Sequence, residues 1–301
     1  MGTKAAKKAE LLNTTGQVLN AEESTGFRAL AARANYLALD RPDVAFATKE
    51  LCREFAQPTK KSVEKLKRLV RYLRHHPRLV WRYDYENVST YIDTHVDTAV
   101  AGCWRTRRST SGGVARLGGH ILKHWSATQS TVTLSSAEAE LTGICKGSSI
   151  SLGLKALCAD LGLDLQIRVH TDAAAAIGIA RRRGLGKVRH LAVSDLWIQD
   201  KVATGEIEIK KVKGTDNPAD ILTKNVDGNL LAVHKRRLGL TQEEGRAASA
   251  AAISKEVVGA LQCLVCCLSS SRRRTRGGVS NRIVHATTMG KGRGSLKSSW
   301  M

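Results

Sequence analysis

The chain has 301 residues, which is room for one or two domains, and 42% of them are hydrophobic, which is enough for a packed core. Its 48 Lys and Arg residues outnumber 27 Asp and Glu residues and give a formal net charge of +21. An excess of this size favours a polyanionic partner, most often nucleic acid, although basic tails at the two ends carry part of the charge.

Several other classes of protein fit the composition poorly. The seven cysteines are an odd number without an evident disulfide framework, and Cys263 and Cys266 lack a second ligand pair for a structural zinc ion. No apolar run reaches the about 18 residues of a membrane span, and the Lys- and Ala-rich start does not resemble a secretory signal. We therefore expect an intracellular protein without a membrane segment, and the sequence does not distinguish the cytoplasm from the nucleus.

The first 87 residues predict a small helical segment after a flexible start. We expect residues 1–23 to be flexible and basic, and residues 24–87 to hold helices, because hydrophobic residues there recur at three- and four-residue spacing. Asp40 is a candidate cap for the second helix, with Pro42 in its first turn. The third helix, over about 60–75, has a basic outer face, which either contacts phosphates or is simply solvated.

The next stretch predicts three strands. Polar and apolar residues alternate up to Asp97 in residues 88–97, as in a strand with one buried face. Residues 112–117 and 120–125 are also strand-like. Gly118 and Gly119 join them, which predicts a β-hairpin.

A long helix is predicted over residues 135–161. Ser135 and Glu138 have the spacing of a capping box at its start. Glu140 lies four residues before Ile144 and therefore borders the apolar face of the helix. Glu138 lies on a different face and is the expected partner of the cap.

Strands and helices alternate in the rest of the domain. We expect a strand, two helices, a strand and a short helix, over about 165–171, 173–183, 190–203, 206–213 and from Asn217 onwards. Asp172 stands where the first of these strands gives way to a helix. Asn217 and Pro218 place Asp220 in the first turn of the last helix. Residues 229–301 are expected to be a basic, largely disordered tail.

This order of elements predicts an α/β fold. We expect a five-stranded mixed sheet with three antiparallel strands, flanked by helices on both faces and preceded by the small helical segment. The order also places four carboxylates at the edges of elements: Asp97, Glu140, Asp172 and Asp220. Each has an ordinary explanation alone, as a turn residue, a solvated helix residue or a cap.

Together, such carboxylates suit phosphodiester hydrolysis. Two divalent ions about 4 Å apart can activate a water molecule and stabilise the leaving oxygen. Mg²⁺ prefers carboxylate oxygens and substrate phosphates as ligands. The four acidic residues therefore predict a site for two divalent metal ions.

Several motifs resemble one family in particular. They are YIDTHVDTAVAGC (91–103), RRSTSG (107–112), TLSSAEAE (133–140), KVRH (187–190) and ADILTK (219–224). Over residues 88–228 the chain resembles the ribonuclease H domain of copia-type retrotransposon polyproteins. Upstream, YLALDRPDVAFA (36–47) and LVRYL (69–73) resemble the thumb- or connection-like end of the reverse transcriptase of the same family.

The resemblance implies a ribonuclease H-like fold and an endonuclease that cleaves the RNA strand of RNA–DNA hybrids with Mg²⁺ or Mn²⁺. The implied catalytic and metal-binding residues are Asp97, Glu140, Asp172 and Asp220, and Asp93 is the alternative to Asp97 because it shares its strand face. The implied partners are the hybrid and the remainder of a reverse transcriptase. Basic residues are the candidates for contacts with the nucleic-acid backbone: Arg105, Arg107, Arg108, Arg181, Arg182, Arg183, Lys187 and Arg189.

The chain departs from the family at three points, the first being two inserted-looking residues, His95 and Val96, which blur the strand register between Asp93 and Asp97. Ala99 stands where the family has a second acidic residue, and the paired-Asp polymerase motif, Tyr-x-Asp-Asp, is absent from the sequence. We therefore expect no polymerase activity. A catalytically inactive nucleic-acid-binding remnant of the same fold is the alternative to an active nuclease. An integrase-type core fits less well, because its Glu comes late in the chain whereas Glu140 comes second.

Overall fold

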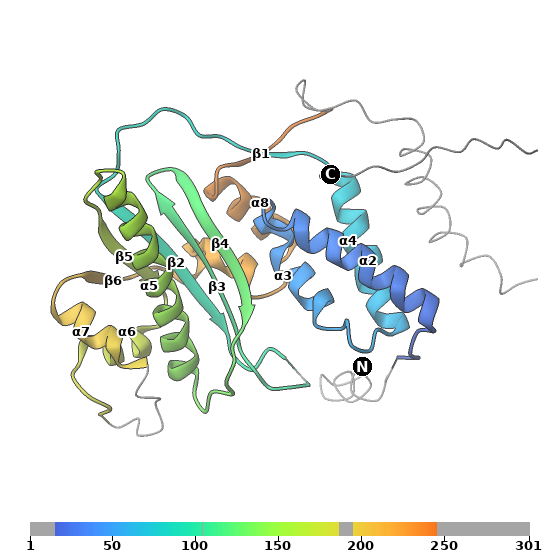
Figure 1. Cartoon of the computed structure of the whole chain (residues 1–301), viewed down its shortest axis with the longest axis horizontal. Helices are drawn as coiled ribbons and strands as arrows, with labels where there is room; N and C mark the ends of the chain where they lie inside the picture. The colour runs from blue at the N-terminus through green and yellow to red at the C-terminus, as the bar shows by residue number, and fades with distance from the viewer. Residues whose placement is uncertain (1–15, 104, 187–194, 246–301) are drawn as a thin grey trace, which may run out of the picture. The chain divides into compact units, whose positions relative to one another are not determined.

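A computed structural model describes residues 16–103, 105–186 and 195–245. Its central sheet is built from β2 (Tyr91–Ala99), β3 (Thr110–Leu117), β4 (His120–Thr128), β5 (Gln166–Thr171) and β6 (Ile207–Lys211). The strand order is β4-β3-β2-β5-β6 (Figure 1). The strands β2, β3 and β4 are antiparallel neighbours, whereas β5 runs parallel to β2 and β6 parallel to β5. The predicted α/β class and five-stranded mixed sheet are confirmed.

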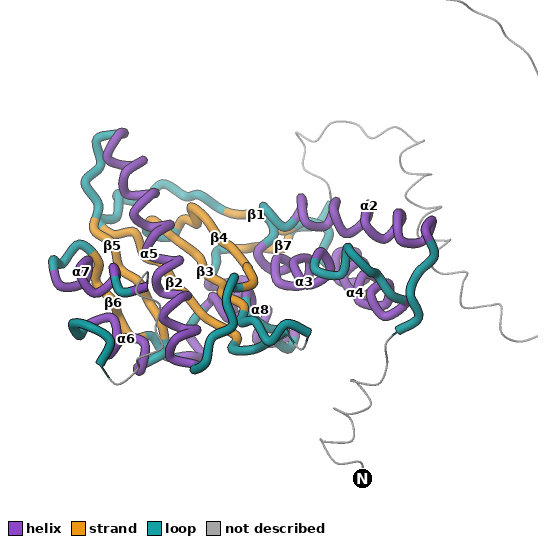
Figure 2. The backbone as a smooth tube through the Cα atoms, turned by 60° about the horizontal axis from the view of Figure 1, so that its bottom comes forward, coloured by secondary structure: helices purple, strands orange, loops and turns teal. Residues whose placement is uncertain are grey.

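Helices pack on both faces of the sheet. The described helices are α2 (Ala21–Leu37), α3 (Pro42–Cys52), α4 (Lys60–His75), α5 (Ser136–Asp160), α6 (Ala174–Arg181), α7 (Trp197–Ala203) and α8 (Gly228–Arg237), with 3-10 turns η2 (Gly214–Asp216) and η3 (Pro218–Leu222). Helices α2, α3 and α4 lie side by side (Figure 2). None of the described helices combines the length and the apolar composition that crossing a membrane would require.

Two hydrophobic clusters lie on opposite faces of the sheet. On one face, Val96 of β2 packs with Leu141 and Ile144 of α5. On the other, Val114 of β3 and Leu222 of η3 join a cluster that includes residues of α2, α3 and α4. Residues of the helical segment and of the sheet therefore share a core.

Regular structure begins closer to the amino terminus than the sequence predicted. Helix α2 begins at Ala21, whereas residues 1–23 were expected to be flexible. The Glu23 N–H donates to Asn20 Oδ1 at 2.8 Å, and the Asn20 N–H donates to Glu23 Oε2 at 3.2 Å. This reciprocal cap satisfies two of the free N–H groups of the helix start and so fixes its first turn. Residues 1–15 lie outside the described residues.

Regular structure also continues into the first part of the predicted tail, residues 229–301. Helix α8 follows η3, and β7 (Leu240–Gln242) pairs antiparallel with β1 (Leu79–Trp81), with Leu240 opposite Trp81. A three-residue strand whose partner lies far away in the sequence leaves no local periodicity to detect. Residues 246–301 lie outside the described part of the chain.

A short stripe of glycines lets α5 lie close to β2. A Cβ atom at Gly143 would lie 2.5 Å from Thr98 Oγ1, and one at Gly147 would lie 2.5 Å from Val96 Cγ1. Contacts this short would force the helix away from the strand. Glu140 is one turn before Gly143, so the close approach also holds Glu140 beside the end of β2.

The variant Gly143→Ala tests this close approach. Its methyl group should overpack against Thr98 and lower the free energy of unfolding by about 1–3 kcal/mol, which exceeds the gain of up to about 1 kcal/mol that Ala brings to a helix.

Gly153→Ala on the same helix is the matched control, because nothing lies within 4 Å of a Cβ atom there. It should stabilise the protein by up to about 1 kcal/mol. Denaturant unfolding of both variants measures the difference. Two stabilised variants would show that α5 does not lie this close to β2.

Candidate functional site

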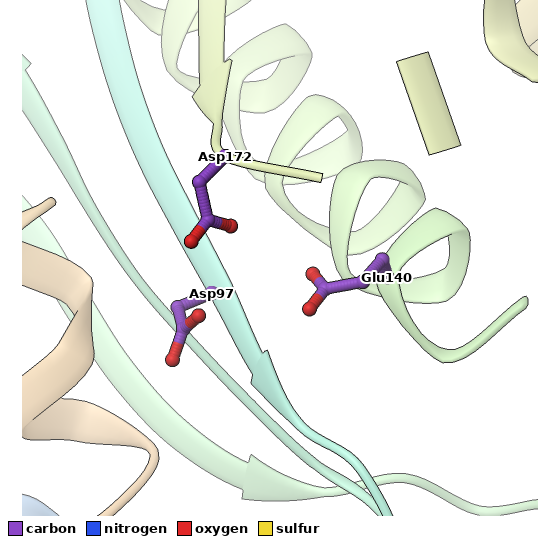
Figure 3. A group of neighbouring side chains, drawn as sticks. All are labelled: Asp97, Glu140 and Asp172. Carbon is purple, nitrogen blue, oxygen red and sulfur yellow. The ribbon is translucent and has the colours of Figure 1, made fainter. Parts of the chain in front are cut away.

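Three of the four predicted carboxylates meet at one edge of the sheet (Figure 3). Asp97 comes from β2, Glu140 from the first turns of α5, and Asp172 directly follows β5. One carboxylate oxygen from each lies within 4.8 Å of those of the other two. The strands β2 and β5 are parallel and neighbours, so their carboxyl ends lie at the same edge. The order of elements that sequence analysis identified is therefore what brings these side chains together.

The 3-10 turn η3 holds Asp97 from the other face of the sheet. The Asn217 side chain accepts a hydrogen bond from the Ala219 N–H and donates one to the Val96 carbonyl oxygen at 2.8 Å. This double contact ties the start of η3 to β2. At the end of η3, the Thr223 hydroxyl donates to Asp97 Oδ2. The Asp97 carboxylate, in a residue only 5% exposed, is thus held by a neighbouring element.

A glycine on β3 makes room for this turn. Gly112 lies directly opposite Asp97 in the β2–β3 register. A Cβ atom at Gly112 would lie 2.7 Å from Leu222 Cβ and 2.7 Å from Thr223 Cγ2. Any larger side chain would therefore displace the end of η3 and the hydroxyl that contacts Asp97.

Asp220 lies beside the three carboxylates but is paired differently. Its Oδ2 lies 2.9 Å from Lys224 Nζ, one helical turn further on. Burial raises the pKa of Asp220 above its ordinary value; the ion pair with Lys224 opposes this rise, and the charges of Asp97 and Asp172 add to it. The charges of Asp97 and Asp172 therefore reach the fourth predicted carboxylate, although it is not part of the group within 4.8 Å.

The charge balance of the site fits a divalent cation. Burial, together with the charges of Asp97 and Asp172, raises the pKa of Glu140 to about 8. Glu140 Oε2 and Asp220 Oδ1 are buried and have no hydrogen-bond partner among the described residues. Unpaired buried oxygens are costly unless a cation coordinates them. A set made only of carboxylate oxygens is the donor set that Mg²⁺ or Mn²⁺ prefers.

Asp93, the alternative to Asp97, lies outside this group. His170 Nε2 lies 2.7 Å from Asp93 Oδ1, and the Arg168 guanidinium donates to Asp93 Oδ2 at 3.1 Å. Both partners come from β5. The structure thus joins Asp97, and not Asp93, to Glu140 and Asp172.

The predicted basic residues divide into three groups. Arg105, Arg107 and Arg108 are exposed in the loop between β2 and β3, at the edge of the sheet where Asp97 lies. Arg107 adopts a left-handed backbone conformation with φ of 57°. The predicted contact of these three residues with a nucleic-acid backbone stays a prediction.

The other groups are less directly placed. The Arg181 guanidinium donates to the Ile209 carbonyl oxygen on β6 at 2.7 Å, and Arg182 donates to the Leu185 carbonyl oxygen. These bonds hold local structure, whereas Arg183 is exposed. Two further predicted residues lie outside the described residues: Lys187 and Arg189.

Sequence reasoning missed Thr223 and Lys224. Both belong to the ADILTK string (219–224), but they received no role because only its acidic residue was considered. The spacing of four residues between Asp220 and Lys224 is a usable signal, because it allows an ion pair across one turn. The contact from Thr223 to Asp97 has no local signal.

Comparisons with known proteins found sequence relatives over much of the chain. No protein-family model matches the chain. The chain is 26% identical over 223 residues to the retrovirus-related Pol polyprotein from transposon RE1 of Arabidopsis thaliana, which covers 73% of this chain. It is 27% identical over 202 residues to the corresponding polyprotein from transposon TNT 1-94 of Nicotiana tabacum, which covers 66% of this chain. Over about 70% of its length the chain is thus similar in sequence to retrovirus-related Pol polyproteins of transposons. It spans about 15% of the length of these two Pol polyproteins.

Other matches are shorter or more distant. An uncharacterized mitochondrial protein of Arabidopsis thaliana is 34% identical over 132 residues, which is 43% of this chain and 53% of that protein. Among solved structures, a ribonuclease H1 isolated from compost covers 44% of this chain and 93% of its own, at 17% identity and a TM-score of 0.32. A foamy viral protease-reverse transcriptase in complex with dsDNA covers 71% of this chain and 42% of its own, at 15% identity and a TM-score of 0.40.

The raised pKa of Glu140 predicts how stability depends on pH. Folding raises this pKa from 4.5 to about 8, so the folded state holds the proton more tightly than the unfolded state. In the metal-free protein this contribution is fully present below pH 4.5 and is lost as the pH rises through about 8. Glu140→Gln should therefore be more stable than the parent at high pH, by up to about 5 kcal/mol because one pKa unit corresponds to about 1.4 kcal/mol, and equal to it near pH 4.

Thermal unfolding in a chelator across this pH range measures the effect. Adding Mg²⁺ at high pH should stabilise the parent and reduce the difference in stability between it and Glu140→Gln, because the ion replaces the proton as the partner of the carboxylate. A parent and a Gln variant that respond identically to pH would contradict the assigned burial and charge of Glu140.

Proposed function

We propose that this chain is the ribonuclease H-like part of a copia-type Pol polyprotein and acts as a metal-dependent endonuclease on the RNA strand of RNA–DNA hybrids. One observation carries the proposal: carboxylate oxygens of Asp97, Glu140 and Asp172 lie within 4.8 Å of one another, and Glu140 Oε2 is buried without a hydrogen-bond partner among the described residues. Like charges this close are costly without a cation. The sequence similarity to transposon Pol polyproteins supports the same assignment.

The residues of the site have distinct tasks in this proposal. Asp97, Glu140 and Asp172 would hold two Mg²⁺ or Mn²⁺ ions, and Asp220 would assist from the side. When bound, such ions supply an activated water molecule and neutralise charge on the scissile phosphate and leaving oxygen.

The chain itself orients these ligands. The Thr223 hydroxyl fixes one oxygen of Asp97, so the other oxygen is left to face the cluster. Lys224 neutralises part of the charge of Asp220. Glu140, whose pKa is about 8, carries a proton near neutral pH and must release it to become a ligand. The affinity for the metal should therefore rise with pH.

Selection of a hybrid duplex would depend on the two strands together. The 2′-hydroxyl groups distinguish RNA from DNA, and the shape of the hybrid distinguishes it from duplex DNA. Arg105, Arg107 and Arg108 lie at the edge of the sheet that carries the cluster, where they can contact the phosphates on either side of the cut.

The variant Asp172→Asn tests the activity. It keeps the size of the side chain but removes a charged ligand, so Mg²⁺-dependent cleavage of a labelled RNA–DNA hybrid should fall by more than about 100-fold. Asp164→Asn is the matched control, because its carboxylate is fully exposed and precedes β5 at the other end of the strand. It should cleave like the parent, and neither protein should cut duplex DNA.

One result would contradict the proposal. If the parent binds the hybrid but does not cut it with Mg²⁺ or Mn²⁺, the chain is the inactive binding remnant. The absence of a second acidic residue at Ala99 would then be the first change to reverse.

A further inference from the structure

A charged cavity lies away from the carboxylate cluster. It has a volume of about 340 Å³ and lies among residues 82–86, the β3–β4 turn and the segment that joins α8 to β7. Four arginines line it: Arg82, Arg116, Arg236 and Arg237. Only two acidic residues, Asp84 and Glu86, line it with them. The cavity therefore has a net positive charge.

Its walls come from elements that are firmly joined. The Tyr83 hydroxyl donates to the Ile121 carbonyl oxygen at 3.1 Å, and the Gly119 N–H donates to Glu86 Oε1 at 2.7 Å. These bonds tie residues 82–86 to the β3–β4 hairpin. Trp81 lies opposite Leu240 in the antiparallel pair of β1 and β7. The next residue, Arg82, therefore lies beside Gly239, close to the last turn of α8.

The arginines have few partners in the protein. Arg237 pairs with Asp216 at 2.7 Å, but the side chains of Arg82 and Arg236 have no ion-pair or hydrogen-bond partner among the described residues. Arg116 is half-buried and its Nη2 donates to the Gly119 carbonyl oxygen at 3.3 Å, whereas its Nε is buried without a partner. A buried guanidinium N–H without a partner is costly unless an anion or water accepts its hydrogen bond.

The helix dipole explains only part of this arrangement. Cations near the carboxyl end of a helix are favourable, and this accounts for Arg236 and Arg237 at the end of α8. It does not account for Arg82 or Arg116, which come from other elements and face the same cavity. Burial also lowers the pKa of Arg116, which Asp93 and Glu86 only partly offset.

We infer that this cavity binds a phosphate group, and that its natural source is the backbone of the nucleic acid that also reaches the carboxylate cluster. Guanidinium groups from three elements are suited to the several oxygens of a phosphate. The choice of nucleic acid as the partner rests on the proposed function, whereas the anion site itself does not.

The spacing along the sheet agrees with a shared duplex. On β2, Asp93 lies opposite Arg116 of the cavity, and Asp97 belongs to the carboxylate cluster. The cavity and the cluster are therefore four residues apart along this strand. Four residues of a strand span about 13 Å, which is about four base-pair steps of a duplex. A duplex that occupies the cluster is therefore long enough to reach the cavity.

The variants Arg236→Gln and Arg82→Gln test the inference in the full chain. Binding of a labelled RNA–DNA hybrid and of duplex DNA is measured by fluorescence anisotropy in a chelator, at several salt concentrations, so that nothing is cleaved. Each variant should bind both duplexes about 5–10-fold more weakly and lower the slope of log affinity against log salt by about 1. Arg82→Gln should leave thermal stability unchanged, because its side chain has no partner to lose among the described residues, and Arg236→Gln should lower the free energy of unfolding by at most about 1 kcal/mol, which is its interaction with the end of α8.

Arg33→Gln is the matched control, because Arg33 is exposed on α2, which lines no part of the cavity. It should bind like the parent. Inorganic phosphate, titrated against chloride at constant ionic strength, separates the two sources of the anion. Phosphate that stabilises the parent but not Arg236→Gln, with duplex binding unchanged, would overturn the assignment to nucleic acid. Unchanged binding of both phosphate and duplex would overturn the site itself.

These outcomes do not depend on cleavage. If the parent fails to cut a hybrid but Arg236→Gln still weakens its binding, the proposed nuclease activity fails and the phosphate site stands. If the parent cuts the hybrid and the variant binds both duplex and inorganic phosphate as the parent does, the phosphate site fails and the nuclease stands.

Discussion

The close packing of two elements against β2, from opposite faces, determines where three of the acidic side chains of the site lie: Asp97, Glu140 and Asp220. Gly143 and Gly147 let α5 approach one face, and Gly112 on the neighbouring strand lets η3 approach the other. At each of these glycines, a Cβ atom would lie less than 3.0 Å from an atom of the element packed against it. Side chains from a strand, a helix and a loop are thereby held at one edge, with little room for them to separate.

That packing has an electrostatic consequence. Four carboxylates gather where burial weakens the screening of charge, and Lys224 is the cation that pairs with one of them. The shared repulsion appears in the raised pKa of Glu140 and of Asp220. A metal-free site of this kind is destabilised as its charges develop, and a divalent cation relieves both the repulsion and the unpaired oxygens. Affinity for a metal and stability of the protein should thus be linked.

The sequence was most informative where periodicity and order of elements suffice. It distinguished Glu140 from Glu138 by helical face, and the structure places Glu140 in the cluster while Glu138 accepts a hydrogen bond from the Leu134 N–H. The strand pattern did not separate Asp93 from Asp97, because both lie on the same face of one strand; the preference for Asp97 came from the family resemblance, and tertiary packing decides which end of the strand meets α5. Non-local contacts, such as the pairing of β1 with β7 or the bond from Thr223 to Asp97, leave no trace in local patterns.

Metal binding at the carboxylate cluster is the central claim. Crystals of the protein grown or soaked with Mn²⁺, measured at the manganese absorption edge, test it directly. We predict an anomalous peak among Asp97, Glu140 and Asp172, and its loss in Asp172→Asn crystals treated in the same way. Clear density for the three side chains without a peak, at an Mn²⁺ concentration that occupies other carboxylate sites, would contradict the claim.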